Sequence, residues 1–150
     1  MFCGAFAADQ PASSGTIIYA AGGSYDGELR LYRRHGWGVF QETAGYKYEG
    51  DWADDERSGY GRELRENGDV YEGQFLADRR HGRGRFLSLR GEEYDGSWAN
   101  GKRDGQGVSI ALPRDEAERQ RQCMSSSLLV HRDKHFLRMK AASGEAGGRK

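Results

Sequence analysis

The sequence predicts an all-β repeat array: an elongated single-layer antiparallel sheet of 23-residue β-hairpin repeats, followed by a C-terminal α-helical tail. First, a tyrosine followed by an acid and a glycine recurs every 23 residues, at Tyr25, Tyr48, Tyr71 and Tyr94. Second, 16 of the 23 glycines fall on four columns in four repeats of this period. A fixed period of roughly 20 to 50 residues indicates one unit stacked on copies of itself, because one unit cannot bury its own apolar face.

Each repeat begins with a strand that has one apolar face. Tyr48, Gly50 and Trp52 alternate with Glu49 and Asp51, and this period of two is typical of a half-buried strand. The fifth position of the four repeats holds Leu29, Trp52, Phe75 and Trp98. We therefore expect one face of the sheet to carry a row of large apolar side chains and the other face to be charged.

Two kinds of connection join the predicted strands. Asn67-Gly68 is a strong signal for a two-residue type I′ hairpin turn, which would pair Glu66 with Asp69. The polar segment 53–58, and likewise 76–81, leads into a Gly-x-Gly sequence and is interpreted as a wider loop. The cross-strand pairs predicted from the two-residue turn include Leu64 with Tyr71, Tyr60 with Phe75, and Trp37 with Trp52.

The same register divides the whole chain. It predicts a degenerate repeat at 2–24, full repeats at 25–47, 48–70 and 71–93, and a truncated repeat at 94–112. The tail occupies 113–150. Pro113 and the acids after it predict a helix start, whereas residues 141–150 are small, polar and expected to be disordered.

The repeat resembles the MORN (membrane occupation and recognition nexus) repeat. The closest matches are Tyr71-Glu72-Gly73-Gln74-Phe75, with His81-Gly82-Arg83-Gly84 after it, and the corresponding residues from Tyr94 to Gly107. The first full repeat departs from the family pattern because its fifth position is Leu29. The resemblance implies a sheet with a groove that serves as a scaffold or docking surface and has no catalytic activity of its own.

Composition limits the function classes. With 150 residues, the chain is too short for this array and a catalytic domain together, so no enzyme activity and no cofactor are expected. The net charge is zero, but residues 1–112 carry 14 basic and 18 acidic residues, and 113–150 carry 9 and 5. The acidic body argues against nucleic-acid binding. Cys3 and Cys123 have no disulfide or zinc spacing, which favours a reducing, cytoplasmic location, with cytoskeletal or membrane association left open.

The tail from Leu128 to Lys140 has an apolar helical face and two interpretations. It could cap the last strand or fill the groove, since an open sheet edge invites pairing. It could instead be a basic amphipathic anchor for an acidic membrane. His131 and His135 lack a third ligand nearby, so no metal site is predicted.

The leading functional hypothesis is a non-catalytic scaffold or adaptor whose aromatic groove binds an extended or helical segment of a partner protein. Its expected contact residues are Tyr48, Trp52, Tyr71, Phe75, Tyr94 and Trp98, which could equally form the minimal core of a one-layer sheet. The alternative is a phosphoinositide or acidic-membrane adaptor that uses the tail and recurring loop arginines. These arginines, predicted to lie along one edge, are Arg33, Arg34, Arg57, Arg79, Arg80 and Arg103. A homodimer through exposed sheet edges is also left open.

Overall fold

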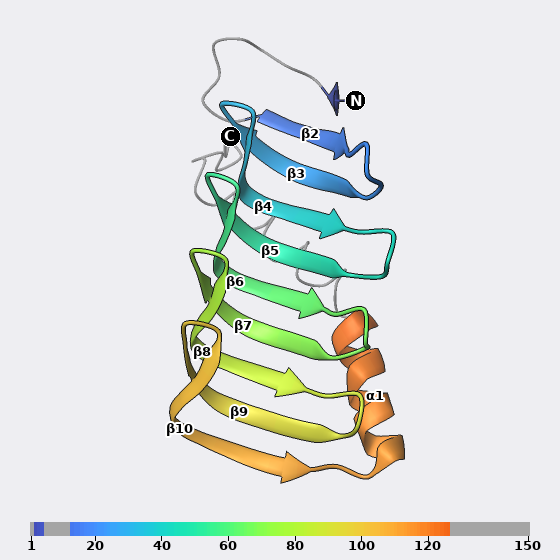
Figure 1. Ribbon diagram of the computed structural model, residues 1–150, viewed down its shortest axis with the longest axis vertical. Coiled ribbons are helices and arrows are strands. Elements are labelled where there is room, and N and C mark those ends of the chain that lie inside the picture. The colour runs from blue at the N-terminus through green and yellow to red at the C-terminus, as the bar shows by residue number, and fades with distance from the viewer. Residues whose placement is uncertain (1, 5–12, 127–150) are drawn as a thin grey trace, which may run out of the picture.

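The protein folds as one antiparallel sheet whose strand order follows the chain (Figure 1). The computed structural model describes residues 2–4 and 13–126, and within them the sheet has ten strands. The strands are β1 (Phe2–Gly4), β2 (Ser13–Ile18), β3 (Ser24–Arg30), β4 (Arg33–Gln41), β5 (Lys47–Ala53), β6 (Glu56–Leu64), β7 (Val70–Leu76), β8 (Arg79–Leu87), β9 (Glu92–Ala99) and β10 (Lys102–Ala111). The predicted all-β single-layer array is therefore confirmed.

The polar segment after each aromatic strand is a tight turn, so the prediction of a wider loop at 53–58 is wrong. Asp54 and Asp55 have φ angles of 47° and 73°, which is the signature of a two-residue type I′ turn. Strand β6 begins immediately afterwards at Glu56. Aspartate tolerates positive φ because its short polar side chain can form hydrogen bonds locally. The polar residues of this segment therefore belong to a tight turn and to the start of the next strand rather than to a wide loop.

The turn at Asn67-Gly68 has three residues rather than two. The N–H of Arg65 donates to the carbonyl oxygen of Asp69 at 2.9 Å, and Gly68 has a φ of 89°. This is the three-residue hairpin loop with glycine in the left-handed region. The extra residue shifts the register by one, so the predicted cross-strand pairs are wrong.

The observed pairs place different side chains on each face of the sheet. Glu63, rather than Leu64, lies opposite Tyr71, and Gly59, rather than Tyr60, lies opposite Phe75. Likewise, Trp52 faces Gly36, and Trp37 faces Asp51. Because neighbouring residues of a strand point to opposite faces, Tyr60 and Trp37 lie on the face opposite Tyr71 and Trp52, and Glu63 lies on the same face as Tyr71.

Glycine faces glycine at every strand pair of the array. Gly50 pairs with Gly61 inside its hairpin, and β1 and β2 pair Gly4 with Gly15 in the same columns. The space is taken by tyrosine: a Cβ at Gly61 would collide with the ring of Tyr48. The phenol of Tyr48 then donates to the carbonyl oxygen of Asp51 at 3.0 Å. The same bond recurs at Tyr25, Tyr71 and Tyr94.

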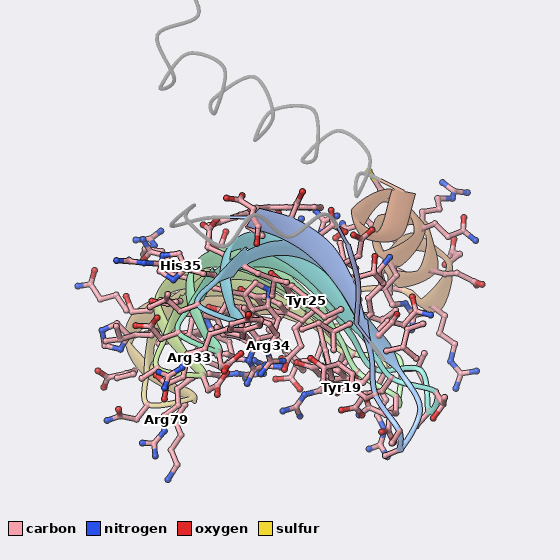
Figure 2. All side chains as sticks on the ribbon, turned by 90° about the horizontal axis from the view of Figure 1, so that it is seen from above. Tyr19, Tyr25, Arg33, Arg34, His35 and Arg79 are labelled. Atoms are coloured by element: carbon pink, nitrogen blue, oxygen red, sulfur yellow. The ribbon has the colours of Figure 1, made fainter. Side chains whose placement is uncertain are left out.

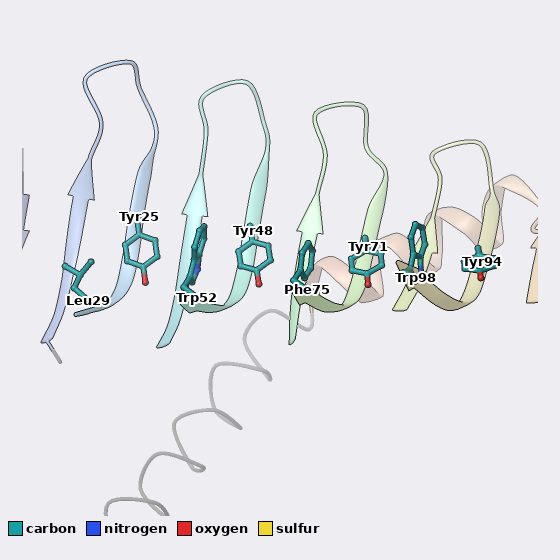
Figure 3. Close-up of a cluster of buried hydrophobic side chains, with 8 residues drawn as sticks. All are labelled: Tyr25, Leu29, Tyr48, Trp52, Tyr71, Phe75, Tyr94 and Trp98. Atoms are coloured by element: carbon teal, nitrogen blue, oxygen red, sulfur yellow. The ribbon is translucent and has the colours of Figure 1, made fainter. Parts of the chain in front are cut away.

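The core is one row of side chains along the sheet (Figure 3). It consists of the first- and fifth-position residues of the four repeats: Tyr25, Leu29, Tyr48, Trp52, Tyr71, Phe75, Tyr94 and Trp98. We call these eight residues the aromatic row. The predicted sharing of one face is confirmed.

The helix α1 (Arg114–Ser126) packs on the opposite face of the sheet. Ala117 is buried against Val70 and Leu87, whose chain neighbours Tyr71 and Phe86 point to the aromatic side. In an end-on view the sheet is arched, and α1 lies outside the arch (Figure 2). The predicted helical tail is confirmed for this segment. The alternatives for 128–140 and the disorder expected at 141–150 lie outside the described residues.

Candidate functional site

The aromatic row lines the inner side of the arch, which we call the concave face (Figure 2). Its rings alternate in perpendicular edge-to-face contacts: Trp52 lies 5.0 Å from Tyr48 of its own repeat and 5.6 Å from Tyr25 of the preceding one. Tyr71 and Trp98 continue the pattern at 5.2 Å and 84°. Such pairs contribute about 0.5–1.5 kcal/mol beyond the area that they bury.

All six predicted contact residues belong to the aromatic row, and all are buried. Their exposed fractions run from 0% for Tyr48 and Tyr71 to 6% for Tyr94. Burial, and after it the carboxylate of Asp51, raises the pKa of the Tyr48 phenol far above its usual range, so the phenol stays protonated and donates. These rings form the core of the sheet, and their role in binding a partner stays a prediction.

Two indoles fasten their hairpins to the hairpin before them. Trp52 Nε1 donates to the carbonyl oxygen of Gly38 at 3.2 Å, and Trp98 Nε1 donates to that of Gly84 at 3.0 Å. Both bonds are buried and cross the boundary between repeats. The aromatic row therefore sets the distance between repeats as well as filling the concave face.

Four of the six predicted arginines cover the aromatic row. Arg34, Arg57, Arg80 and Arg103 occupy one column of strands β4, β6, β8 and β10, and we call them the arginine row. The guanidinium carbon of Arg34 lies 4.3 Å from the ring centroid of Trp52, and that of Arg80 lies 4.7 Å from Tyr71. These are cation–π distances. The sequence pattern placed these arginines in wide loops. They lie in strands because each of those segments is a two-residue turn and the next strand begins directly after it.

Turn aspartates hold two members of the arginine row across repeat boundaries. Asp55 Oδ1 accepts from the backbone N–H of Arg34 at 2.9 Å and from its Nε at 3.3 Å. Asp78 binds Arg57 in the same way, at 2.9 Å and 3.1 Å. The next turn has Gly101 in this position, so Arg80 receives no turn carboxylate and binds elsewhere.

Glu63 is the centre of a buried ionic cluster on the concave face. It stands in a column where neighbouring repeats have Phe40 and Phe86, and its side chain is only 5% exposed. Its carboxylate accepts from Arg80 Nη2 at 2.6 Å and from Arg57 Nη1 at 2.8 Å. Burial alone would raise the pKa of Glu63, but the two guanidinium groups outweigh it and lower the pKa below its usual range.

The two remaining predicted arginines, Arg33 and Arg79, lie at the exposed starts of β4 and β8 beside the two-residue turns. Figure 2 shows both side chains at the same rim of the arch. The six arginines are thus divided between the arginine row, which is exposed only at Arg103, and an exposed rim. Among the described residues, no group of three or more histidines, cysteines or acids could hold a metal ion.

Partly buried rings on the concave face were missed by the sequence analysis. Phe40 packs against Tyr19 at 5.8 Å and Tyr46 at 6.1 Å, and Phe86 lies beside Arg103 further along. We call Tyr19, Phe40 and Tyr46 the aromatic cluster. The signal that could have found it is the 23-residue column that contains both Phe40 and Phe86.

Comparison with known proteins agrees with the repeat geometry. The family model described as MORN repeat matches residues 48–70, 71–88 and 94–110. The matched segments follow one another along the sheet and carry the tyrosine, the paired glycines and three of the four members of the arginine row, all but Arg34. A search of curated proteins gives no match. Within the described part of the chain, no helix is long and apolar enough to cross a membrane.

Proposed function

Because this chain is a MORN repeat protein, we propose that it is a non-catalytic interaction module whose concave face binds a segment of a partner protein. Repeats of this family are in general non-enzymatic modules. The proposed contact surface is the aromatic cluster together with the accessible edges of the arginine row. The aromatic row beneath is the rigid floor of this surface.

The aromatic cluster is the observation that carries the proposal. Its three rings keep part of their surface exposed, whereas the rings of the aromatic row are buried. Arg57 extends this surface, since its Nη1 lies 2.7 Å from the hydroxyl of Tyr46. Aromatic residues and arginines on a rigid support are the residue types that contribute most to binding energy in protein interfaces.

An acidic phospholipid surface receives less support from this geometry. Arg34 and Arg57 are engaged by the turn aspartates, and Arg80 by Glu63. Replacing these partners with phosphate would require breaking contacts that join the repeats. Arg103 is paired with Glu92, so the exposed pair Arg33 and Arg79 would be left to carry binding among the six arginines, and two surface cations attract an acidic membrane only weakly. The basic tail that this alternative also uses lies largely outside the described residues.

The test compares two aromatic substitutions on opposite faces of the same sheet. Phe40→Ala removes the centre of the aromatic cluster, and Tyr60→Ala removes a ring that is 44% exposed on the other face. A partner would be identified by cross-linking the wild-type chain in its source cells and then produced separately. Its affinity should fall at least about tenfold with Phe40→Ala and stay within about twofold with Tyr60→Ala.

Two outcomes would contradict the proposal. Equal losses for both variants would place the contact away from the concave face. Salt-sensitive binding to phosphatidylserine vesicles that disappears on replacing Arg33 and Arg79 with alanine, without any effect of Phe40→Ala, would support the membrane function instead. Thermal melting of each variant shows whether the sheet is intact.

A further inference from the structure

The last strand leaves one edge of the sheet open. All ten residues of β10 are exposed, and no described segment pairs with its outer edge (Figure 1). The helix α1 begins just after β10 but runs back over the face of the sheet, where Ala117 contacts Val70 and Leu87. The edge is thus available for strand pairing, and its side chains determine which strand fits.

The three boundaries that follow β4, β6 and β8 use the same contacts. A turn N–H donates to the carbonyl oxygen of the preceding repeat's arginine: Asp55 to Arg34 at 2.9 Å, and Gly101 to Arg80 at 2.9 Å. The first strand of the next repeat, which we call the arriving strand, places its glycine opposite a glycine of the preceding strand. Its large fifth-position side chain follows two residues after that glycine. At the last internal boundary, Gly96 faces Gly84, and Trp98 faces Gly82.

The arriving aromatic residue enters a site made of three groups from the preceding repeat. Trp98 lies edge-to-face against Tyr71 at 5.2 Å, beneath the guanidinium of Arg80 at 5.3 Å. Its indole donates to the carbonyl oxygen of Gly84 at 3.0 Å. Trp52 enters the corresponding site of the repeat before it. Phe75 fills the site of Tyr48 and Arg57 without a donor. Such a site therefore accepts an aromatic side chain and adds a hydrogen bond when that side chain is an indole.

The same three groups are present in the last hairpin, β9 and β10, where no further repeat follows among residues 13–126. They are Tyr94, Arg103 and the carbonyl group of Gly107, and we call them the terminal socket. The side chain of Arg103 is 38% exposed, against 22% for Arg34, 20% for Arg57 and 10% for Arg80, which cover or adjoin arriving residues.

We propose that β10 and the terminal socket bind an extended strand of a separate partner protein that carries an aromatic-x-Gly-x-Trp or aromatic-x-Gly-x-Phe sequence. The glycine of the partner's strand would lie opposite Gly107, and its tryptophan or phenylalanine would lie opposite Gly105. This is the register of the internal boundaries. Main-chain bonds along the edge supply affinity, and the socket supplies selectivity. This surface shares only Arg103, the last member of the arginine row, with the concave-face contact proposed above.

A second copy of this chain paired through β10 does not fit the socket. The side chains that β10 places on the concave face opposite Trp98 and Tyr94 are Arg103 and Ser109. Neither is aromatic, so two β10 strands would meet without filling either socket. The sequence Phe2-Cys3-Gly4-Ala5-Phe6 of a second copy also has the aromatic-x-Gly-x-Phe pattern, but it lacks the indole that donates to the glycine carbonyl oxygen at the internal boundaries. A separate partner with a tryptophan is therefore the occupant that makes all of the contacts, and a second copy is an outcome of the test below.

The experiment is an NMR titration of the full chain with a synthetic peptide that has the sequence of residues 47–53, the strand β5 with its Tyr-Glu-Gly-Asp-Trp motif. Amide shifts should concentrate on Lys102–Ala111. Replacing the peptide's tryptophan by alanine should weaken binding about tenfold or more. Arg103→Ala in the protein should have a similar effect, whereas Lys102→Ala, at the exposed start of β10 and outside the socket, should change affinity less than about twofold.

Three results would overturn the proposal. The first is the absence of peptide-induced shifts at millimolar peptide. The second is a set of shifts on the aromatic cluster instead of β10. The third is a concentration-dependent dimer of the free protein whose protected amides are those of β10, which would make a second copy the occupant.

Discussion

Replacing Glu63 by glutamine is expected to destabilise the sheet strongly, although the shape of the side chain is kept. Glu63 is 5% exposed, and the Arg80 side chain that it binds is 10% exposed. Removing one partner of a buried ion pair costs about 3–5 kcal/mol, because the other charge stays buried without compensation. The amide oxygen of glutamine can still accept one guanidinium bond, and Arg57 keeps Asp78. We therefore expect the lower end of the range, about 3 kcal/mol.

Urea unfolding followed by tryptophan fluorescence measures this loss, since Trp52 and Trp98 lie on either side of the ionic cluster. With a slope of about 1–3 kcal/mol per molar urea, the midpoint should fall by roughly 1–3 M. Glu66→Gln is the matched control, because Glu66 is exposed in the adjoining turn. It should change stability by less than about 0.5 kcal/mol.

The stability that Glu63→Gln loses should also depend on pH. The folded-state pKa of Glu63 is lowered, so its ionised carboxylate stabilises the fold above its unfolded pKa, about 4.3. That stabilisation decreases as the pH falls from the unfolded pKa through the folded one. The stability difference between wild type and Glu63→Gln should therefore be full at pH 7 and shrink below about pH 4. Equal midpoints at pH 7, or a difference that does not change with acid, would refute this reasoning.

Three further variants, two with one substitution and one with two, test the repeat geometry by the same unfolding assay. Gly61→Ala should destabilise by about 3 kcal/mol or more, because the new methyl group collides with the buried ring of Tyr48. Trp52→Phe should cost about 1–3 kcal/mol, since it loses the indole hydrogen bond and leaves a small cavity. Replacing Leu31 and Tyr32 together by asparagine and glycine should stabilise by about 1 kcal/mol, because both residues adopt positive φ in the first two-residue turn.

Each of these expectations has a control. Gly45→Ala introduces a methyl group at a position with open space, so it should cost less than Gly61→Ala despite its φ of 103°. Phe75 occupies the position of Trp52 in the next repeat, so Trp52→Phe should leave the protein folded. Unchanged stability on replacing the turn residues by asparagine and glycine would show that the backbone at Leu31 and Tyr32 relaxes without cost.

The shared face of the aromatic row could be predicted because it needs only two periods. The 23-residue step relates Tyr48 to Tyr71, and the two-residue alternation places Trp52 on the face of Tyr48. Neither depends on turn geometry. The helix start after Pro113 was likewise a local signal, and α1 begins at Arg114.

The register could not be predicted because the two turns look alike in sequence. An Asn-Gly pair suits a two-residue turn and also the last two residues of a three-residue turn, which is what Gly68 forms. One residue of slip exchanges the faces of a strand. This is why Tyr60 was expected on the face of the aromatic row and why Glu63 was not.

Much of the candidate site depends on side-chain contacts that spacing does not encode. The arginine column was recognised, but its direction into the concave face follows from the corrected register. The ionic cluster joins Arg57, Glu63 and Arg80 from two repeats, and it exists because Gly101 replaces the aspartate that earlier turns supply. A single sequence does not show that one substitution compensates for another.

The strand order also determines how the protein should fold. Each strand pairs only with its neighbours in the chain, so no pairing requires distant segments to find one another. Loop-closure entropy is then small for every step, and such topologies fold fast for a β-sheet. Unfolding should start at an end and move inward, one hairpin at a time. Amide hydrogen exchange should accordingly be fastest in β10 and slowest near β6 and β7, where the buried ionic cluster ties adjacent repeats together.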